Sequence, residues 1–214
     1  MAPVTELVLS TLKPGVSAES LYPIFATLKS QPGNTAVRAA PPSEDPSQIR
    51  LFIDWDDIAA HQAFRATDAY KSYLGQLAPY VTTPTQIMHA ELTPFPPVVL
   101  EKSPSTEFLL LYIDPDEDEA KVLQAGKTLA RGLTADGIKG TTGLSAVGLT
   151  VEKDVEYKGE KVRVMVMLLG WESDEAHRTA SATDPAFKAA QVEFHEAIPD
   201  LKGFKIEHVA AKVL

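Results

Sequence analysis

Two short stretches of the chain carry the same potentially reactive residues in the same order. The first reads IDWDDIAAHQAFRATDAYK from Ile53, and the second reads LGWESDEAHRTASATDPAFK from Leu169. At an offset of 116, Trp55 corresponds to Trp171 and His61 to His177. A neutral histidine is a ready general base, and an indole can wall an apolar substrate pocket. The repeat therefore predicts a candidate site in each half of the chain.

We expect the second half to hold the better site, with Trp171 as a pocket wall and His177 as a base or a donor to a carbonyl. Trp55 and His61 are their first-half counterparts. The remaining candidates for substrate contact are aromatic or imidazole side chains: Tyr112, His208, His89 and Tyr73. In a chain with two such halves, one half can keep the chemistry while the other fills with side chains.

A purely structural interpretation of these residues stays open. A buried histidine needs a hydrogen-bond partner, and buried tryptophans most often pack in a core. His89 and His208 alternate with apolar neighbours in the last predicted strand of each half. His195 follows VEF near a helix end, where a surface cation suits the helix dipole, so we expect it at the surface.

Composition excludes several classes of protein. The chain has no cysteine, so disulfide frameworks, thiolate zinc sites, iron–sulfur clusters and cysteine nucleophiles are ruled out. Its formal charge is −9, which disfavours binding to nucleic acid or to anionic membranes. Glycine-rich nucleotide loops, the G-x-S-x-G elbow and H-E-x-x-H are also missing from the sequence. A small molecule is the expected partner.

The elements that must position these residues follow one order twice. In the first half we expect a strand over 6–12, a helix over 17–30 capped by Ser17, strands over 35–40 and 49–55, a broken helix over 57–78 and a strand over 85–92. In the second half we expect a strand over 107–113, a helix over 117–133, strands over 144–154 and 161–171, a broken helix over 173–197 and a strand over 204–213. Asp57 and Ser173 are matched N-cap candidates, and Gly159 can supply a hairpin turn.

This order is βαββαβ in each half, the ferredoxin-like unit, and the fold class is α+β. A proline-rich stretch, TPFPPVVLEKSPS, separates the halves and predicts an extended connector. We expect a first unit over 1–94, a linker over 95–104 and a second unit over 105–214. The strands at 109–113 and 164–171 are continuous apolar runs, typical of strands buried on both faces, so we expect the two sheets to pack together. The first residues do not resemble a secretory signal, which favours a cytoplasmic protein.

In each half a Trp at the end of a strand is followed by Ala-His in a helix, then by a short break in that helix, and then by Tyr or Phe. With this pattern the chain resembles the dimeric α+β barrel superfamily. Its nearest branch is the antibiotic-biosynthesis-monooxygenase-type (ABM) domain. Most members pair two chains, so this chain resembles a fused pseudo-dimer, and further association into a homodimer stays open. The resemblance implies an enzyme that acts without metal or organic cofactor on an aromatic or polyketide-type substrate.

The resemblance leaves several activities open. Oxygenation is slightly preferred over cyclisation, isomerisation or dehydration, and a non-catalytic ligand-binding or stress-response barrel is the alternative from another class. In the haem-degrading branch a histidine follows the break, but Leu74 and Gln191 stand at those positions here. A haem binder would instead need His195 turned inward. An open cavity of about 300 Å³ beside the tryptophan and histidine would favour an enzyme or a ligand binder.

Overall fold

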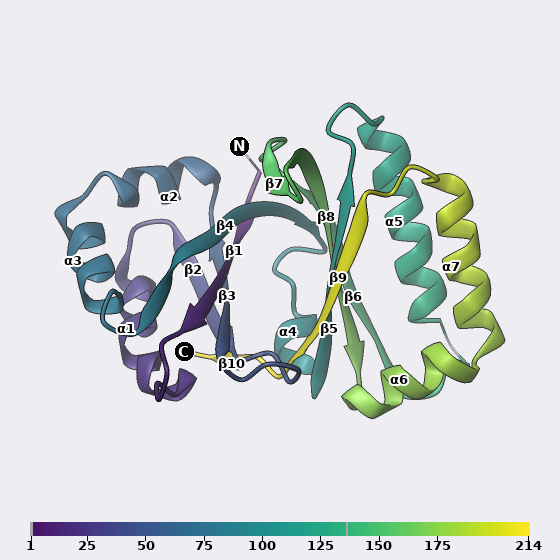
Figure 1. The fold of residues 1–214 in the computed structure, drawn as a ribbon, viewed down its shortest axis with the longest axis horizontal. Helices are drawn as coiled ribbons and strands as arrows, with labels where there is room; N and C mark the ends of the chain where they lie inside the picture. The colour runs from purple at the N-terminus through teal and green to yellow at the C-terminus, as the bar shows by residue number, and fades with distance from the viewer. Residues whose placement is uncertain (1, 136) are drawn as a thin grey trace. The chain divides into compact units, whose positions relative to one another are not determined.

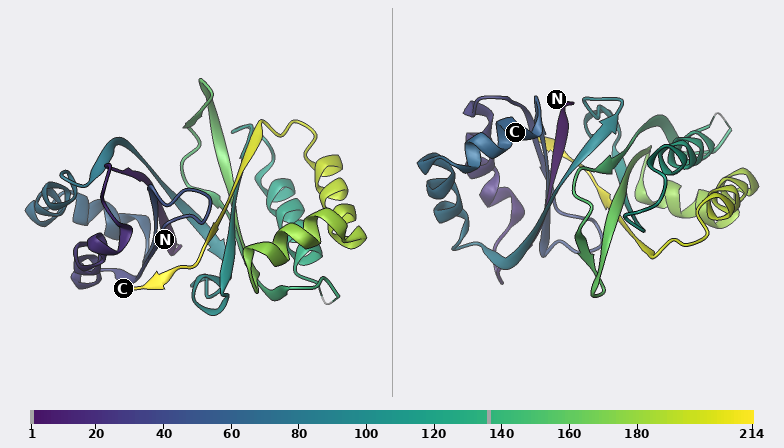
Figure 2. Two further views of the ribbon diagram at one scale, coloured as in Figure 1. Left: turned by 60° about the horizontal axis from the view of Figure 1, so that its bottom comes forward. Right: turned by 90° about the horizontal axis from the view of Figure 1, so that it is seen from above.

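The chain forms two compact units, each described here by itself. The computed structural model describes residues 2–135 and 137–214, with only the backbone of Thr83 and Pro84. The first unit comprises 1–90 and 211–214, and the second comprises 91–210. The last four residues thus belong to the unit that contains the N-terminus (Figure 2).

In the first unit an antiparallel sheet has the strand order β10-β2-β3-β1-β4 (Figure 1). Its strands are β1 (Val4–Leu12), β2 (Asn34–Ala40), β3 (Gln48–Trp55), β4 (Val81–Thr93) and β10 (Lys212–Val213). Between β1 and β2 lie a 3₁₀ turn (Ala18–Leu21), α1 (Tyr22–Ala26) and a second 3₁₀ turn (Thr27–Ser30); α2 (Ile58–Arg65) and α3 (Asp68–Leu77) connect β3 to β4.

In the second unit the antiparallel order is β6-β8-β5-β9, with β7 pairing on β8. The strands are β5 (Ser105–Ile113), β6 (Thr141–Thr150), β7 (Val155–Tyr157), β8 (Glu160–Trp171) and β9 (Gly203–Val209). The helices are α4 (Val99–Lys102), α5 (Glu119–Leu133), α6 (Asp174–Thr183) and α7 (Pro185–Ala197). In all three ribbon views α5 and α7 lie side by side (Figures 1 and 2).

The predicted α+β class and the βαββαβ order are confirmed in both units. The helix caps that start the second helical segment are confirmed as well: Asp57 accepts from the Ala60 amide, and Ser173 from the Ala176 amide. The predicted break in the second helical segment is present in both units. It falls at matched positions, because Thr67 is the N-cap of α3 and Asp184 is the N-cap of α7. These caps fix where each second helix starts and which of its faces turns toward the sheet.

Four local predictions were wrong. Ser17 makes no capping bond, because its hydroxyl donates to the Glu19 carboxylate instead. The segment 17–30 is one short α-helix between two 3₁₀ turns rather than a continuous helix; Pro23 lies at its start. The connector holds the short helix α4, whose N-cap Val98 directly follows Pro97. The strand expected over 204–213 divides into β9 and β10, and β10 pairs with β2.

The two apolar runs are buried, as predicted. Every residue of β5 is buried, and so is β8 from Val162 to Trp171. Trp55 and Trp171 are completely buried, each in the core cluster of its own unit. Gly159 adopts a positive φ of 83° in the turn between β7 and β8, which confirms the expected hairpin turn.

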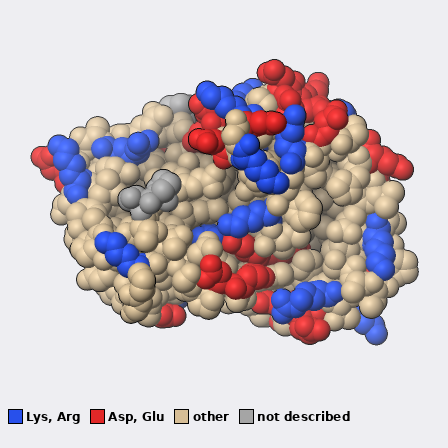
Figure 3. Space-filling model, viewed as in Figure 1, with Lys and Arg blue, Asp and Glu red and all other residues tan. Residues whose placement is uncertain are grey.

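The surface carries charges of both signs. On the face shown in Figure 3, acidic and basic side chains are interspersed among uncharged residues. Within the described residues, no helix has the length and apolar character that a membrane crossing requires.

Candidate functional site

Four side chains of the first unit form one buried polar cluster, here called the first tetrad: Glu6, Trp55, His61 and His89. Strand register brings Glu6 on β1 directly opposite His89 on β4. Trp55 Nε1 donates to Glu6 Oε2 at 2.9 Å, and His61 Nε2 lies 3.5 Å from the same oxygen. His61 Nδ1 and His89 Nε2 share a hydrogen bond of 2.6 Å. A continuous path for protons therefore joins the carboxyl group to two imidazoles.

The second unit repeats this arrangement in the second tetrad: Glu107, Trp171, His177 and His208. Glu107 on β5 lies opposite His208 on β9. Trp171 Nε1 donates to Glu107 Oε2 at 3.1 Å, His177 Nε2 lies 3.3 Å from that oxygen, and His177 Nδ1 lies 2.7 Å from His208 Nε2. The same contacts in two units of divergent sequence define one structural motif.

Stacked rings hold the histidines in place. The Trp55 and His61 rings are 5.1 Å apart between centroids and nearly parallel, and Trp171 and His177 are 4.9 Å apart. Burial raises the pKa of Glu107 to about 7, although the Trp171 hydrogen bond opposes this shift. A carboxyl group with a pKa near neutrality can both accept and release a proton at physiological pH.

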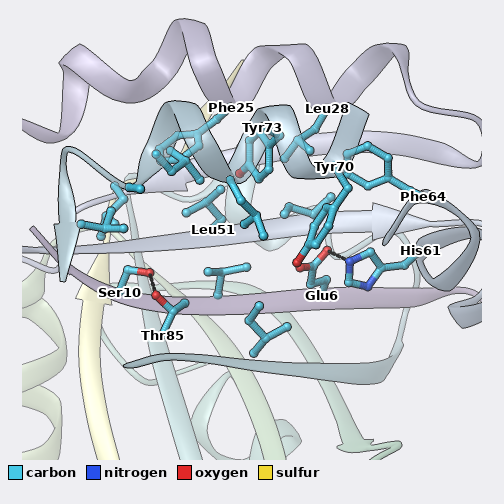
Figure 4. Close-up of a pocket in the computed structure, with 18 of the residues that line it drawn as sticks. Glu6, Ser10, Phe25, Leu28, Leu51, His61, Phe64, Tyr70, Tyr73 and Thr85 are labelled. Atoms are coloured by element: carbon cyan, nitrogen blue, oxygen red, sulfur yellow. Dashed lines mark hydrogen bonds and ion pairs between the residues drawn. The ribbon is translucent and has the colours of Figure 1, made fainter. Parts of the chain in front are cut away.

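The first tetrad opens into an aromatic cavity of about 370 Å³ (Figure 4). Glu6, Trp55 and His61 line it from one end. Apart from these three, the lining is mainly apolar and aromatic: Val8, Phe25, Leu28, Ile49, Leu51, Ile53, Phe64, Tyr70, Tyr73, Leu74, Leu77, Ala78, Val81 and Ile87. The volume lies within the range of small-molecule sites.

The first cavity has polar side chains in two regions, one near Glu6 and one away from it. In Figure 4 Tyr70 points toward Glu6, and the Tyr70 and His61 rings meet edge to face at 6.5 Å. Burial raises the pKa of Tyr73, and the nearby charge of Glu6 adds to the shift, so Tyr73 keeps its phenolic proton. Away from Glu6, the hydroxyl groups of Ser10 and Thr85 are hydrogen-bonded at 3.0 Å.

The second tetrad opens into a cavity of about 380 Å³ with a different lining. Glu107 and His177 line it, next to leucine and phenylalanine side chains of β5, α5 and α7. Lys188, Gln191 and His195 also line this cavity and are exposed, so they form its rim. The cavity therefore has an apolar interior and a polar edge.

The structure brings together most of the predicted site residues. His61, Trp55 and Tyr73 line the first cavity, and His177 lines the second. His89 and His208 are not among the described lining residues, but they are hydrogen-bonded to His61 and His177, which are. Trp171 contacts Glu107 and His177, but it is not among the described residues that line the second cavity.

Four further residues named in the sequence analysis can also be located in the structure. Tyr112 stacks on Tyr157 at 3.8 Å and is not among the described residues lining either cavity. His195 is exposed, as predicted, and borders the second cavity. Leu74 and Gln191 line the first and second cavities respectively.

The two glutamates of the tetrads were not predicted as site residues. A signal was present, because both first strands begin alike, with Thr5-Glu6-Leu7 and Thr106-Glu107-Phe108. A charged residue at matched positions of two apolar strands indicates a buried carboxyl group with a specific partner.

One group of described residues has the composition of a metal site. Glu6, His61 and His89 each offer one ligand atom, and these atoms lie within 4.8 Å of one another. Two histidines and one carboxylate are the ligand set of many non-haem iron oxygenases. In the present geometry, however, the nitrogens of His61 and His89 face each other in a hydrogen bond.

The site can now be compared with known proteins. The sequence profile of the antibiotic biosynthesis monooxygenase family matches residues 11–76. A sequence search of curated proteins gives no match.

Solved structures share the fold over the whole chain. An anthrone oxidase-like protein is 15% identical, with a TM-score of 0.68 over 100% of this chain and 94% of its own. A candidate monooxygenase from Fusobacterium nucleatum is 12% identical, with a TM-score of 0.62 over 99% and 94%. One from Lactobacillus acidophilus is 10% identical, with a TM-score of 0.58 over 100% and 96%. The chain therefore shares its fold with these proteins over its whole length, and residues 11–76 of its first unit resemble the antibiotic biosynthesis monooxygenase family.

Proposed function

We propose that the first unit is a cofactor-independent oxygenase for a planar phenolic or anthrone-type aromatic substrate. The observation that carries this proposal is the first tetrad, a buried proton-accepting cluster at one end of an aromatic cavity of about 370 Å³. The family profile matches this unit, and one structure of similar fold is an anthrone oxidase-like protein.

The proposed reaction begins with proton abstraction. Glu6 or His61 takes a proton from the substrate, and the hydrogen bond between His61 and His89 spreads the acquired proton over the tetrad. The aromatic walls stabilise the resulting delocalised anion by contact with its faces. Tyr73, which keeps its proton, can donate a hydrogen bond to the substrate oxygen.

The electron-rich carbon of the anion then reacts with dioxygen. In the net reaction a ring methylene loses two hydrogens and becomes a carbonyl. One oxygen atom of O₂ becomes the carbonyl oxygen, and the other leaves as water together with those two hydrogens. No further reductant is needed. The apolar cavity keeps bulk water away from the reactive carbanion.

The first unit is preferred over the second for this role, although the sequence favoured the second. Trp55, Tyr70 and Tyr73 all line the first cavity. In the second cavity the lining residue at the start of the helix is Phe187, which offers no proton. A phenolic substrate needs both aromatic faces and hydrogen-bond donors, and the first cavity supplies both.

Oxygen uptake tests the proposal directly. Purified protein is mixed with anthrone-type and naphthol substrates, and oxygen consumption is recorded together with incorporation of label from ¹⁸O₂. We expect one O₂ consumed per substrate and one labelled oxygen in the product. A product formed without oxygen would replace the oxygenase by a cyclase or isomerase. Unchanged substrate throughout the panel would favour a ligand-binding barrel.

A second candidate function uses the same residues with a metal. The ligand set of Glu6, His61 and His89 supports a divalent-metal oxygenase, provided that the bond between the histidines opens. Metal analysis of the purified protein, followed by activity with and without a chelator, separates the two candidates. Activity that survives complete metal removal supports the cofactor-independent enzyme.

A further inference from the structure

We propose that the cavity of the second unit is a separate binding site for a small amphipathic carboxylate. Its hydrocarbon part would contact the leucine and phenylalanine interior, and its carboxylate would lie at the rim beside Lys188. The inference does not depend on the proposed oxygenase, because it concerns the residues of the other unit.

Matched helices show what distinguishes the two cavities. Numbered from their caps, Thr67 and Asp184, α3 and α7 correspond at an offset of 117. Lys71 therefore corresponds to Lys188. The Lys71 ammonium pairs with the Asp68 carboxylate at 2.9 Å on the surface, and Lys71 is not among the described residues lining the first cavity.

Lys188 differs from its counterpart in both respects. It lines the second cavity, and within the described residues its side chain forms no ion pair. Asp184 is engaged as a cap by the amides of Ala186 and Phe187. A cation at a cavity mouth without an acidic partner favours an anionic ligand.

The rest of the rim changes in the same direction. Leu74 and Ala78 line the first cavity, and their counterparts Gln191 and His195 line the second. An apolar rim in one unit is thus replaced in the other by an amide and an imidazole, both able to donate hydrogen bonds to a carboxylate. One cation with two neutral donors suits a single negative charge.

The interior changes in the opposite direction. Tyr70 and Tyr73 of the first unit correspond to Phe187 and Ala190, so two phenols are lost. The hydroxyl pair of Ser10 and Thr85 is replaced by Leu111 and Phe204, which face each other across β5 and β9. Apart from Glu107 and His177 at the tetrad end, the wall of the second cavity is therefore mainly hydrocarbon, and its other charged and hydrogen-bonding side chains lie toward the rim.

The acidic groups near this cavity leave the rim attractive to an anion. Glu107 lies at the tetrad end of the cavity, and burial keeps its pKa at about 7, so it carries only part of a charge at neutral pH. Glu193 and Glu196 are on the same helix as Lys188, but they are not among the described residues that line the cavity.

Calorimetric titration with a matched pair of probes tests the proposal. The probes are 2-naphthoate and neutral 2-naphthamide, which share the hydrocarbon part. We expect naphthoate to bind about fivefold more tightly, and raising the salt concentration to reduce this preference. Lys188→Gln should abolish the preference and leave naphthamide binding unchanged, while Lys188→Arg should retain it.

Lys71→Gln is the matched control, because it removes the same charge at the corresponding position of the first unit. It should preserve the preference for naphthoate. Equal affinity of the two probes for the wild-type protein would overturn the proposal. Equal loss in both glutamine variants would also overturn it, since attraction would then come from surface charge in general. Weaker naphthamide binding in Lys188→Gln would show that packing, not charge, had been lost.

Discussion

The two units keep the same polar cluster and surround it with different cavities. Each tetrad joins a glutamate, a tryptophan and two histidines with matching contacts, and the Glu–His distances are 3.5 and 3.3 Å. Around the first tetrad the interior carries phenols and the rim is apolar. Around the second the interior is hydrocarbon and the rim is polar.

The residues of each tetrad are therefore constrained by their own hydrogen bonds, whatever ligand the cavity binds. A buried carboxyl group is costly unless it is hydrogen-bonded, so each of its partners must be kept together with it. Apolar side chains that line the cavity need no hydrogen-bond partner, so each can be substituted independently of the others. The tetrad is therefore common to both units, and the units differ in the side chains that line their cavities.

Replacing Glu6 should reduce activity far more than replacing its counterpart Glu107, and this is the largest effect that we expect. Glu6→Gln retains the shape of the side chain but removes the carboxylate that either accepts the substrate proton or pairs with His61 when His61 accepts it. We expect oxygen consumption to fall by about 10²–10⁴-fold, the usual contribution of a general base. The rate is measured at saturating substrate, and folding is checked by thermal unfolding.

Glu107→Gln is the matched variant in the second unit. It should keep more than half of the wild-type rate if the chemistry belongs to the first unit. If Glu107→Gln instead abolished activity and Glu6→Gln did not, the second unit would be the active one, as the sequence alone suggested.

Most of the fold could be predicted from the sequence because its signals are local. The caps at Asp57 and Ser173, the turn at Gly159 and the apolar runs of β5 and β8 each follow from a few neighbouring residues. The exceptions depend on distant contacts. For example, β10 is separate from β9 because it pairs with β2. This pairing was not predicted, since β2 lies far away in the sequence.

The candidate site was predictable only in part, for a related reason. Trp55, His61 and their counterparts stand out through the internal repeat. The contact of Glu6 with His89 depends on the register of two strands separated by most of the first unit. The residues that line the two cavities could not be predicted from the sequence. Which face of α3 or α7 points toward a cavity depends on packing within each unit.

A smaller effect concerns stability and compares the buried Glu107 with an exposed glutamate. Burial raises the pKa of Glu107 from 4.5 to about 7 in the folded protein. The folded state thus holds this proton more tightly than the unfolded state, so stability from this group is complete below pH 4.5 and is lost as the pH rises through 7. The loss amounts to about 3 kcal/mol at about 1.4 kcal/mol per pKa unit.

Urea unfolding from pH 4 to pH 8 measures this loss. Glu107→Gln should match the wild type at low pH and become the more stable protein above pH 7. Glu119→Gln should be less stable than the wild type by an amount that is constant above about pH 5 and shrinks only at lower pH, because the hydrogen bond from Arg163 lowers the pKa of Glu119. A stability difference between wild type and Glu107→Gln that does not vary with pH would mean that Glu107 keeps one protonation state throughout this range.

The smallest expected effect tests the phenols that distinguish the first cavity. Tyr73→Phe removes one hydroxyl group and leaves the aromatic wall. We expect kcat/KM to fall by about threefold to tenfold, the value of one net hydrogen bond of about 1 kcal/mol. Tyr112→Phe is the control, because Tyr112 stacks on Tyr157 in the second unit and should leave the rate unchanged. If Tyr112→Phe lost as much activity as Tyr73→Phe, or more, the Tyr73 hydroxyl group would have no specific role in binding the substrate in the first cavity.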